Sequence, residues 1–485
     1  MLSTSTIAIL KALNLQEIKR FGDFINSPYH NSTKGLDKIY KIVLKAYPDF
    51  TSPDLKTEAM EKKVFGAGAY KEKRLKNLCA EFGNLLQKFI GYEQIYKNGL
   101  EVDINITKGL VMRGVFKSAV NFIEKSKART EEIPFFDSEL IYYRYNTGCG
   151  KKQIKGATQN AFYKNELNEI ENERCDALVS FFMRDFYEAA HSYDVSKGLG
   201  YLTKVNIIEN FIDAFNMNLF LDSLKKTNNQ YYTFIKTHYL LYYHFKNDIS
   251  EELFYELKKN VLKLAHLVGK LNAFDLILKT IHLIQIKLVP IERKYYHDII
   301  DLGKLFCELK IFETGEEFKI SIGTINDIFL PAVIVKEYDW AEEFAREYCQ
   351  YLEEGLRENQ LNYCLGVLSY KRGRYEESLN FLNRIKLTVF QQKHSVYYYY
   401  LMNYIEIKAF ESALSTLQAF KQFFIDVKNI PVFFQDANKS LKYFHEIIKC
   451  EMDGKKIDGL LYEEAKSIKS FPHKPYVMEK MEKLK

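Results

Sequence analysis

The sequence predicts an all-α protein, a right-handed α-solenoid of antiparallel helix pairs with a small helical unit at the N-terminus. Its 485 residues are too many for one ordinary core, which favours an array. None of its nine prolines lies between Phe135 and Val289, and so long a proline-free stretch disfavours many short strands and turns. An aromatic residue in an acidic setting recurs every 35 residues, at Trp340, Tyr375 and Phe410.

Composition indicates a folded, intracellular protein. Hydrophobic residues make up 47% and charged residues 27% of the chain, which excludes a disordered protein. No segment approaches the ~18 consecutive apolar residues that span a bilayer, and the N-terminus lacks the pattern of a secretory signal. The seven cysteines are scattered and never spaced as CxxC. We therefore expect reduced thiols and a cytoplasmic location.

The first 100 residues predict a basic N-terminal helical unit. Residues 1–76 hold 14 Lys and Arg against 8 Asp and Glu, so they carry the whole net charge of +6. One helix is expected through Leu10 and Phe24, ending at NSPYHN, and a second from about Leu36. A third helical region, roughly 70–96, leads into GLEVDINITKGL, which indicates a boundary near residue 100.

Residues 101–310 predict an array of long helices. One or two helices are expected over 105–150, interrupted at Pro134 and at the glycine-rich segment YNTGCGKKQIKG, followed by a long helix over 161–190. Further helices are expected near 201–219, 228–246, 250–268, 272–288 and 291–309. Such lengths with short polar joints suit antiparallel helix pairs.

Residues 311–485 predict degenerate repeats followed by C-terminal capping helices. After Tyr375, the offsets +3, +7 and +10 hold Ser378, Leu382 and Ile385, and after Phe410 they hold Ala413, Leu417 and Phe420. This is the tetratricopeptide pattern, in which small residues allow close helix crossing and an aromatic packs between neighbouring units. We assign Trp340, Tyr375 and Phe410 to this repeat packing. The unit around Trp340 departs from the pattern, because Glu343 stands where a small residue is expected.

A broader resemblance covers nearly the whole chain. The segments RFGDFINSPYHN, LKAYPDF, KEYDWAEEF and HKPYVMEKMEKL resemble a family of uncharacterised bacterial proteins predicted to be tetratricopeptide-like helical arrays. That family has no established activity or catalytic residues. The resemblance therefore implies an architecture and transfers no site.

Two glycine-rich segments have some features of phosphate-binding loops. TGCGKK lacks the first glycine and the final hydroxyl of GxxxxGK[ST], since Tyr145 and Lys152 stand there, so we favour a flexible interhelix loop. GAGAY (66–70) lacks the third glycine of a dinucleotide fingerprint and indicates a turn. The ten histidines form no HxxxH or HExxH pair, and no nucleophile motif occurs. We predict no cofactor, metal or catalytic residue, and an enzyme is unsupported.

Two surface patterns keep alternatives open. The run Tyr397–Tyr400 is either packing or a stacking platform, but four consecutive helical positions point all round the axis, so at least two must face the core. The lysines Lys34, Lys38, Lys41 and Lys45 form either a solvated helix face or a docking face for an acidic partner.

The leading functional hypothesis is a protein-interaction scaffold or adaptor that binds a partner peptide or helix along a concave helical-repeat surface. The alternative is a nucleic-acid-associated regulator that docks through the basic N-terminal unit. A third hypothesis, an enzyme, would need a deep polar pocket with perturbed ionisable groups.

Overall fold

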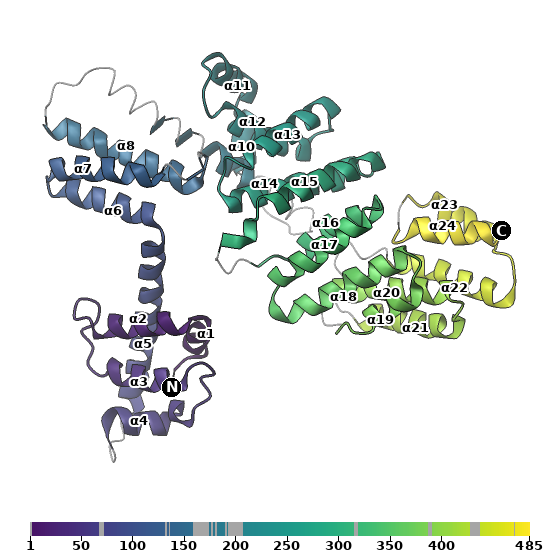
Figure 1. Ribbon diagram of the computed structural model, residues 1–485, viewed down its shortest axis with the longest axis horizontal. Coiled ribbons are helices and arrows are strands. Elements are labelled where there is room, and N and C mark those ends of the chain that lie inside the picture. The colour runs from purple at the N-terminus through teal and green to yellow at the C-terminus, as the bar shows by residue number, and fades with distance from the viewer. Residues whose placement is uncertain are drawn as a thin grey trace. The chain divides into compact units, whose positions relative to one another are not determined.

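The fold is all-α, as predicted. The computed structural model describes residues 2–66, 72–130, 133–134, 136–158, 174–175, 178–179, 182–189, 192, 207–314, 319–386, 390–426, 437–469 and 471–485. These residues form helices and turns without any strand (Figure 1). They divide into two compact units: unit 1 comprises Met1–Glu132 and Tyr142–Arg174, and unit 2 comprises Ile133–Ile141 and Cys175–Lys485.

Unit 1 contains helices α1 to α7 and most of α8, with separate hydrophobic cores within α1–α5 and around α7 and α8. The helices are α1 (Thr4–Ala12), α2 (Leu15–Asn26), α3 (Leu36–Ala46), α4 (Thr57–Phe65), α5 (Glu72–Lys97), α6 (Gly99–Met112), α7 (Phe116–Lys127) and α8 (Ser138–Thr158), with 3₁₀ turns at Pro53–Leu55 and Ala128–Thr130.

The single helix expected through Leu10 and Phe24 is two helices, α1 and α2. Asn14 ends the first and begins the second, because its side chain accepts a hydrogen bond from the Glu17 amide while the Glu17 carboxylate accepts one from the Asn14 amide. This reciprocal capping box satisfies two amides that have no partner inside the helix. The chain can therefore turn between Leu13 and Leu15 without losing backbone hydrogen bonds.

The glycine-rich segment YNTGCGKKQIKG is not a loop but lies inside α8. The close packing of one of its glycines, Gly150, accounts for a glycine inside this helix. A Cβ at Gly150 would lie 3.1 Å from the Thr107 methyl of α6, and one at Gly148 would lie 3.5 Å from Arg174 Cβ. Glycine here permits close approach of neighbouring chain segments, a role that sequence alone does not separate from flexibility. The segment GLEVDINITKGL is likewise helical, in α6.

Two other predictions fall partly outside the described residues. Of GAGAY, only Gly66 is described, and it ends α4 with a φ of 94°. Of the helix expected over 161–190, residues 182–189 are helical, whereas 161–173 lie outside the described part. The helix expected near 201–219 is two helices separated at Asn216, whose side chain caps the second.

Unit 2 holds the remaining helices around one continuous hydrophobic core. They are α10 (Ile207–Ala214), α11 (Met217–Lys226), α12 (Tyr232–Lys246), α13 (Glu251–Leu264), α14 (Lys270–Leu283), α15 (Tyr296–Glu308), α16 (Ile322–Ile334), α17 (Tyr338–Tyr348), α18 (Glu354–Lys371), α19 (Tyr375–Leu382), α20 (Phe390–Glu406), α21 (Phe410–Asp426), α22 (Ala437–Asp453), α23 (Gly459–Ser467) and α24 (Lys474–Lys483). Short 3₁₀ or π segments occur at Ile284–Leu288, Arg293–Tyr295, Ile311–Thr314 and Cys349–Tyr351.

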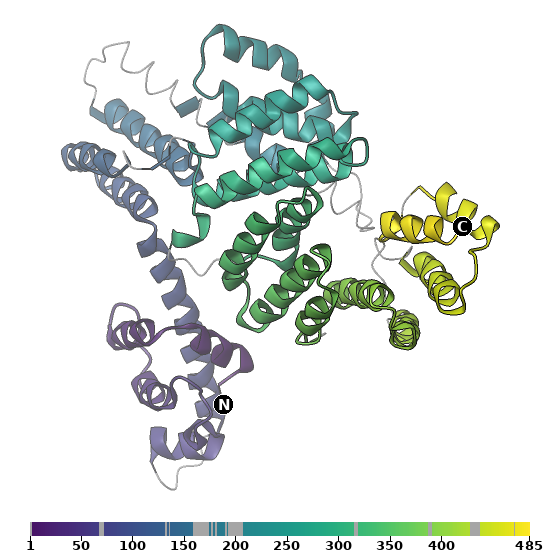
Figure 2. The ribbon, with the colours of Figure 1, turned by 45° about the vertical axis from the view of Figure 1, so that its right-hand side comes forward.

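The helices of unit 2 pack in a regular order. Each helix from α12 to α22 contacts the next one in sequence. The even-numbered helices also contact one another in succession, α12 with α14, α14 with α16, α16 with α18, and α18 with α20 (Figures 1 and 2). The even-numbered helices therefore form one row, and the odd-numbered helices between them pack on that row.

The same three-residue turn joins four helix pairs. Its middle residue has a positive φ: 72° at Gly114, 69° at Lys336, 76° at Gly373 and 57° at Lys408. In each turn, the amide that follows this residue donates to a carbonyl five residues earlier, as Arg374 does to Ser369 at 2.8 Å. This hydrogen bond satisfies a carbonyl at the end of the first helix, and the left-handed residue reverses the chain.

The turns set a common register for the second helix of each pair. Two residues after the left-handed position stands an aromatic residue: Phe116, Tyr338, Tyr375 or Phe410. Three residues further on stands a small residue with no exposed surface: Ala119, Ala341, Ser378 or Ala413. The small residue allows the two helices of the pair to cross closely.

Candidate functional site

The basic residues singled out in the sequence lie on the outside of unit 1. Lys34, Lys38, Lys41 and Lys45 are all exposed, the last three on α3 and Lys34 two residues before it. The Lys38 ammonium donates to the carbonyl of Val64 at 2.8 Å. Lys38 therefore connects α3 to the end of α4 and is not wholly available to a partner.

The three aromatic residues of the 35-residue spacing are all half-buried. Tyr375 and Phe410 begin α19 and α21, but Trp340 is the third residue of α17. Counted from the turn, the residue equivalent to Tyr375 and Phe410 is Tyr338, so Ala341 stands where Glu343 appeared to break the pattern. The equal spacing in sequence does not give an equal position, because these two turns lie 37 residues apart (373 − 336).

Trp340, in α17, lies against residues of α15. Its ring stacks on Phe344 with centroids 5.5 Å apart, and the Lys304 ammonium lies 5.7 Å from the indole. A Cβ at Gly303 of α15 would lie 3.2 Å from the Trp340 ring. Trp340 thus shares, with Ile328 of α16, the space beside Gly303 that the missing side chain leaves.

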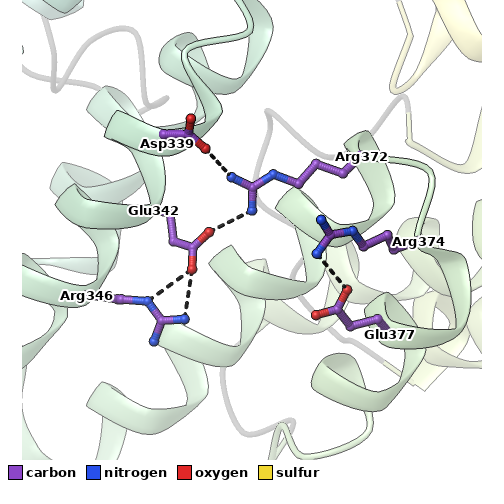
Figure 3. Close-up of polar contacts among 6 residues, drawn as sticks. All are labelled: Asp339, Glu342, Arg346, Arg372, Arg374 and Glu377. Carbon is purple, nitrogen blue, oxygen red and sulfur yellow. Dashed lines mark hydrogen bonds and ion pairs between the residues drawn. The ribbon is translucent and has the colours of Figure 1, made fainter.

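An ion-pair network connects α17 to the turn after α18 (Figure 3). The Arg372 guanidinium donates to Asp339 at 2.7 Å and to Glu342 at 2.6 Å, and Glu342 also accepts from Arg346 at 2.8 Å. Hydrogen bonds from Arg372, and then from Arg346, lower the pKa of Glu342. The Asp339 side chain is 97% exposed. Because every carboxylate in it is already paired, the network connects neighbouring helix pairs and offers no open anion- or cation-binding site.

A polar pocket lies within unit 2, between residues 182–189, α12 and α14. Its lining consists of Tyr187, Glu188, His238, Leu241, Tyr242 and Lys279. Burial raises the pKa of Glu188 against the opposing charges of Lys279 and Arg184. Burial, with the same two cations, lowers the pKa of His238 to about 3. The pocket has an accessible volume of about 10 Å³, which is room for about one water molecule and not for a substrate.

The tyrosine run of α20 provides part of the helical core. Tyr398 and Tyr399 are 0% and 5% exposed, while Tyr397 and Tyr400 are half-buried. At least two of the four face the core, as the helical geometry requires. The Tyr398 hydroxyl also forms a 2.6 Å hydrogen bond with Ser440 of α22.

The C-terminal helix α24 contacts α22 and α23, and it also reaches α20 through Lys480. His473, immediately before α24, places its ring 4.8 Å from Tyr398 and 5.6 Å from Tyr399 of α20, by centroids. The Tyr476 ring stacks on Phe444 of α22 at 6.0 Å. Burial raises the pKa of Tyr476, and Tyr370 at the end of α18 adds to the shift, so this tyrosine lies near α18 as well.

Ionic and apolar contacts also hold α24 in place. The Lys480 ammonium lies 3.1 Å from the Glu406 carboxylate of α20 and 3.6 Å from the Glu451 carboxylate of α22. The exposed fractions of these three side chains are only 11%, 20% and 19%. Val477 and Met481 are fully buried. We call the surface under α24 the acceptor face; it consists of Tyr370, Tyr398, Tyr399, Glu406, Phe444 and Glu451.

The acceptor face is not among the sites predicted from the sequence, although C-terminal capping helices are predicted. The face combines residues from α18, α20 and α22, which lie up to 81 positions apart in the chain (451 − 370). One signal was present: Glu406 stands within an apolar and aromatic segment, where an unpaired carboxylate is costly. A cation was therefore to be expected nearby.

No cluster of three or more metal-ligating side chains occurs among the described residues. Within the same residues, no helix combines the length and apolar character needed to cross a bilayer. His244 is fully buried, and neither of its ring nitrogens has a hydrogen-bond partner among the described residues. Comparisons of the chain with protein-family models, with curated proteins and with solved structures give no match.

Proposed function

We propose that unit 2 is a right-handed, tetratricopeptide-like stack of helix pairs that acts as a scaffold or adaptor and binds a helical segment of a partner protein. The succession of even-numbered helices and the recurring turn support the stacked arrangement. Stacked helix pairs leave an extended surface along one row of helices, and such surfaces hold peptides or helices.

The observation that supports this proposal is the packing of α24 on the acceptor face. The acceptor face already holds a helix of the same chain, through ring contacts, buried aliphatic side chains and an ion pair. Grooves that hold amphipathic helices use the same three kinds of contact. The small polar pocket gives no comparable support for an enzyme, because its volume admits about one water molecule.

A peptide-display selection on the full-length chain tests the proposal. We expect helix-forming peptides that bind the wild-type chain and lose binding to Glu406→Lys, which reverses a charge on the acceptor face. Glu411→Lys is the matched control, because Glu411 is exposed at the start of α21 and belongs to no part of that face. Selected peptides that bind all three chains equally would refute the proposal.

The alternative, that unit 1 docks on nucleic acid through its lysines, has weaker support. One of the four lysines is bound to a backbone carbonyl within the unit. Binding of the full chain to duplex DNA over a salt series decides the question. An affinity that falls steeply with salt, and falls further when Lys34, Lys41 and Lys45 are replaced by glutamate, would favour this alternative.

A further inference from the structure

The helix on the acceptor face is short and depends on its contacts for stability. α24 contains 10 residues, fewer than the roughly 12 that an isolated helix needs to be even marginally stable in water. The residue before it, His473, has a left-handed backbone with a φ of 56° and makes no side-chain cap. Helix formation and docking of α24 are therefore one coupled equilibrium.

The contacts of α24 specify what else could occupy the face. An aromatic ring at Tyr476 meets Phe444, aliphatic groups at Val477 and Met481 are buried, and a cation at Lys480 lies between Glu406 and Glu451. On a helix, the positions i, i+1, i+4 and i+5 share one side. Glu479 and Lys483 of α24 pair with each other at 2.7 Å in solvent, whereas Lys474 donates to the carbonyls of Lys466 and Ile468.

We propose that residues 471–485 are an intramolecular competitor for the acceptor face, and that the partner is a basic amphipathic helix. The partner presents an aromatic residue, two aliphatic residues and a lysine or arginine at the spacing of Tyr476, Val477, Met481 and Lys480. This inference rests on the proposed scaffold function and adds the chemistry of the partner and the means of regulation. A partner gains access only to the fraction of molecules in which α24 is released, so its apparent affinity is reduced by that fraction.

The test uses full-length chains and a fluorescently labelled peptide of residues 471–485. In the variant Lys480→Glu, a negative charge replaces the ammonium group between Glu406 and Glu451, which favours release of α24 without altering the face. We expect this chain to bind the labelled peptide at least tenfold more tightly than wild type does, measured by fluorescence anisotropy. The control Lys483→Glu alters a 64% exposed lysine of the same helix and should bind like wild type, since surface pairs contribute little.

Two further probes define the partner class. A labelled peptide with its own Lys480→Glu change should bind none of the chains. A host helix of alanine, glutamate and lysine that carries only the four anchor residues should compete with the labelled peptide. Failure of this host helix, while the peptide of residues 471–485 still binds, would overturn the stated partner chemistry.

The remaining outcomes separate the two proposals. Equal binding of the peptide to wild type and to Lys480→Glu would overturn the competitor role but leave a helix-binding face. No binding to either chain would show that the peptide cannot replace α24 on the acceptor face. A third outcome is that the labelled peptide binds Lys480→Glu more tightly, but a display selection on Lys480→Glu yields no peptide whose binding depends on Glu406. The scaffold function would then be refuted, whereas the release of α24 would be supported. Far-UV circular dichroism and Trp340 emission, which reports on the distant α15 and α17, confirm that each variant is folded.

Discussion

Replacing Gly366 with alanine tests the close crossing of α18 and α19 on which the helix-pair arrangement depends. A Cβ at Gly366 would lie 2.8 Å from Leu382 Cδ2 and 2.9 Å from its Cγ, both too short for contact between carbon atoms. Leu382 has no exposed surface and cannot swing away. The Ser378 hydroxyl donates to the Gly366 carbonyl at 2.7 Å and accepts from Asn403 at 2.9 Å, so widening the crossing also strains these hydrogen bonds.

Two opposing effects set the magnitude. Alanine in a helix interior is more stable than glycine by about 1 kcal/mol, because the glycine backbone loses more freedom on folding. Overpacking a tight core costs about 1–3 kcal/mol. We expect overpacking to dominate and Gly366→Ala to lower the free energy of unfolding by roughly 1 kcal/mol. Gly355→Ala, in the first turn of the same helix, meets nothing within 4 Å and should be neutral or stabilise by up to about 1 kcal/mol.

Urea denaturation followed by Trp340 fluorescence measures both variants. Trp340 is the only tryptophan, and α17, in which it lies, contacts α18, so the signal reports on the neighbouring helix pair. The transition midpoint is the quantity to compare, because a long array need not unfold in a single step. A midpoint that rises in Gly366→Ala as much as in Gly355→Ala would refute the close crossing.

Three further predictions follow from the turn, the tryptophan and a buried histidine. Gly373→Ala should destabilise by about 1 kcal/mol, because a Cβ is strained at its φ of 76°, whereas Lys408→Gly should stabilise by up to about 1 kcal/mol; thermal melting of the two variants checks the opposite signs. Trp340→Ala should cost about 2 kcal/mol, less than the ~3–5 kcal/mol of a fully buried aromatic, since the indole is half-exposed; urea denaturation followed by circular dichroism measures it. Burial first, and then Lys371 and His394, lowers the pKa of His473 to about 3, so between pH 6.5 and 3 the unfolded chain binds a proton that the folded chain does not. Stability should therefore fall as the pH drops below 6.5, by up to about 1.4 kcal/mol per pH unit, and melting of His473→Asn at pH 5 and 7 should show a smaller fall than wild type.

Helical periodicity and the scarcity of prolines were sufficient to predict the fold class, because both act within a few residues. The segments expected near 228–246, 250–268 and 272–288 correspond to α12, α13 and α14. The spacing of the aromatic residues alone did not predict the register of the repeats. The turn that places Tyr338, and not Trp340, at the equivalent position has lysine at its left-handed residue, Lys336, where glycine would have marked it.

Local glycine content was a poor guide to loops. YNTGCGKKQIKG is helical, and its Gly150 allows close packing against Thr107 of α6, a property that depends on tertiary contacts. Conversely, a break that did occur, at Asn14, had a readable signal in the Asn-x-x-Glu capping box. Glycine marks conformational freedom, whereas a reciprocal cap marks an actual helix end.

The charges of the acceptor face explain why a partner there would have to be basic. Glu406 and Glu451 both lie within reach of the Lys480 ammonium, and four-fifths of each side chain is removed from solvent. A neutral or acidic helix on this face would leave two like charges close together and without a cation, at a cost that apolar contacts do not repay. The ion pair need not add much net affinity to have this effect, because selectivity arises from the cost imposed on the wrong occupant. Lys480 therefore keeps the resting chain stable, and the two glutamates determine which helix can replace it.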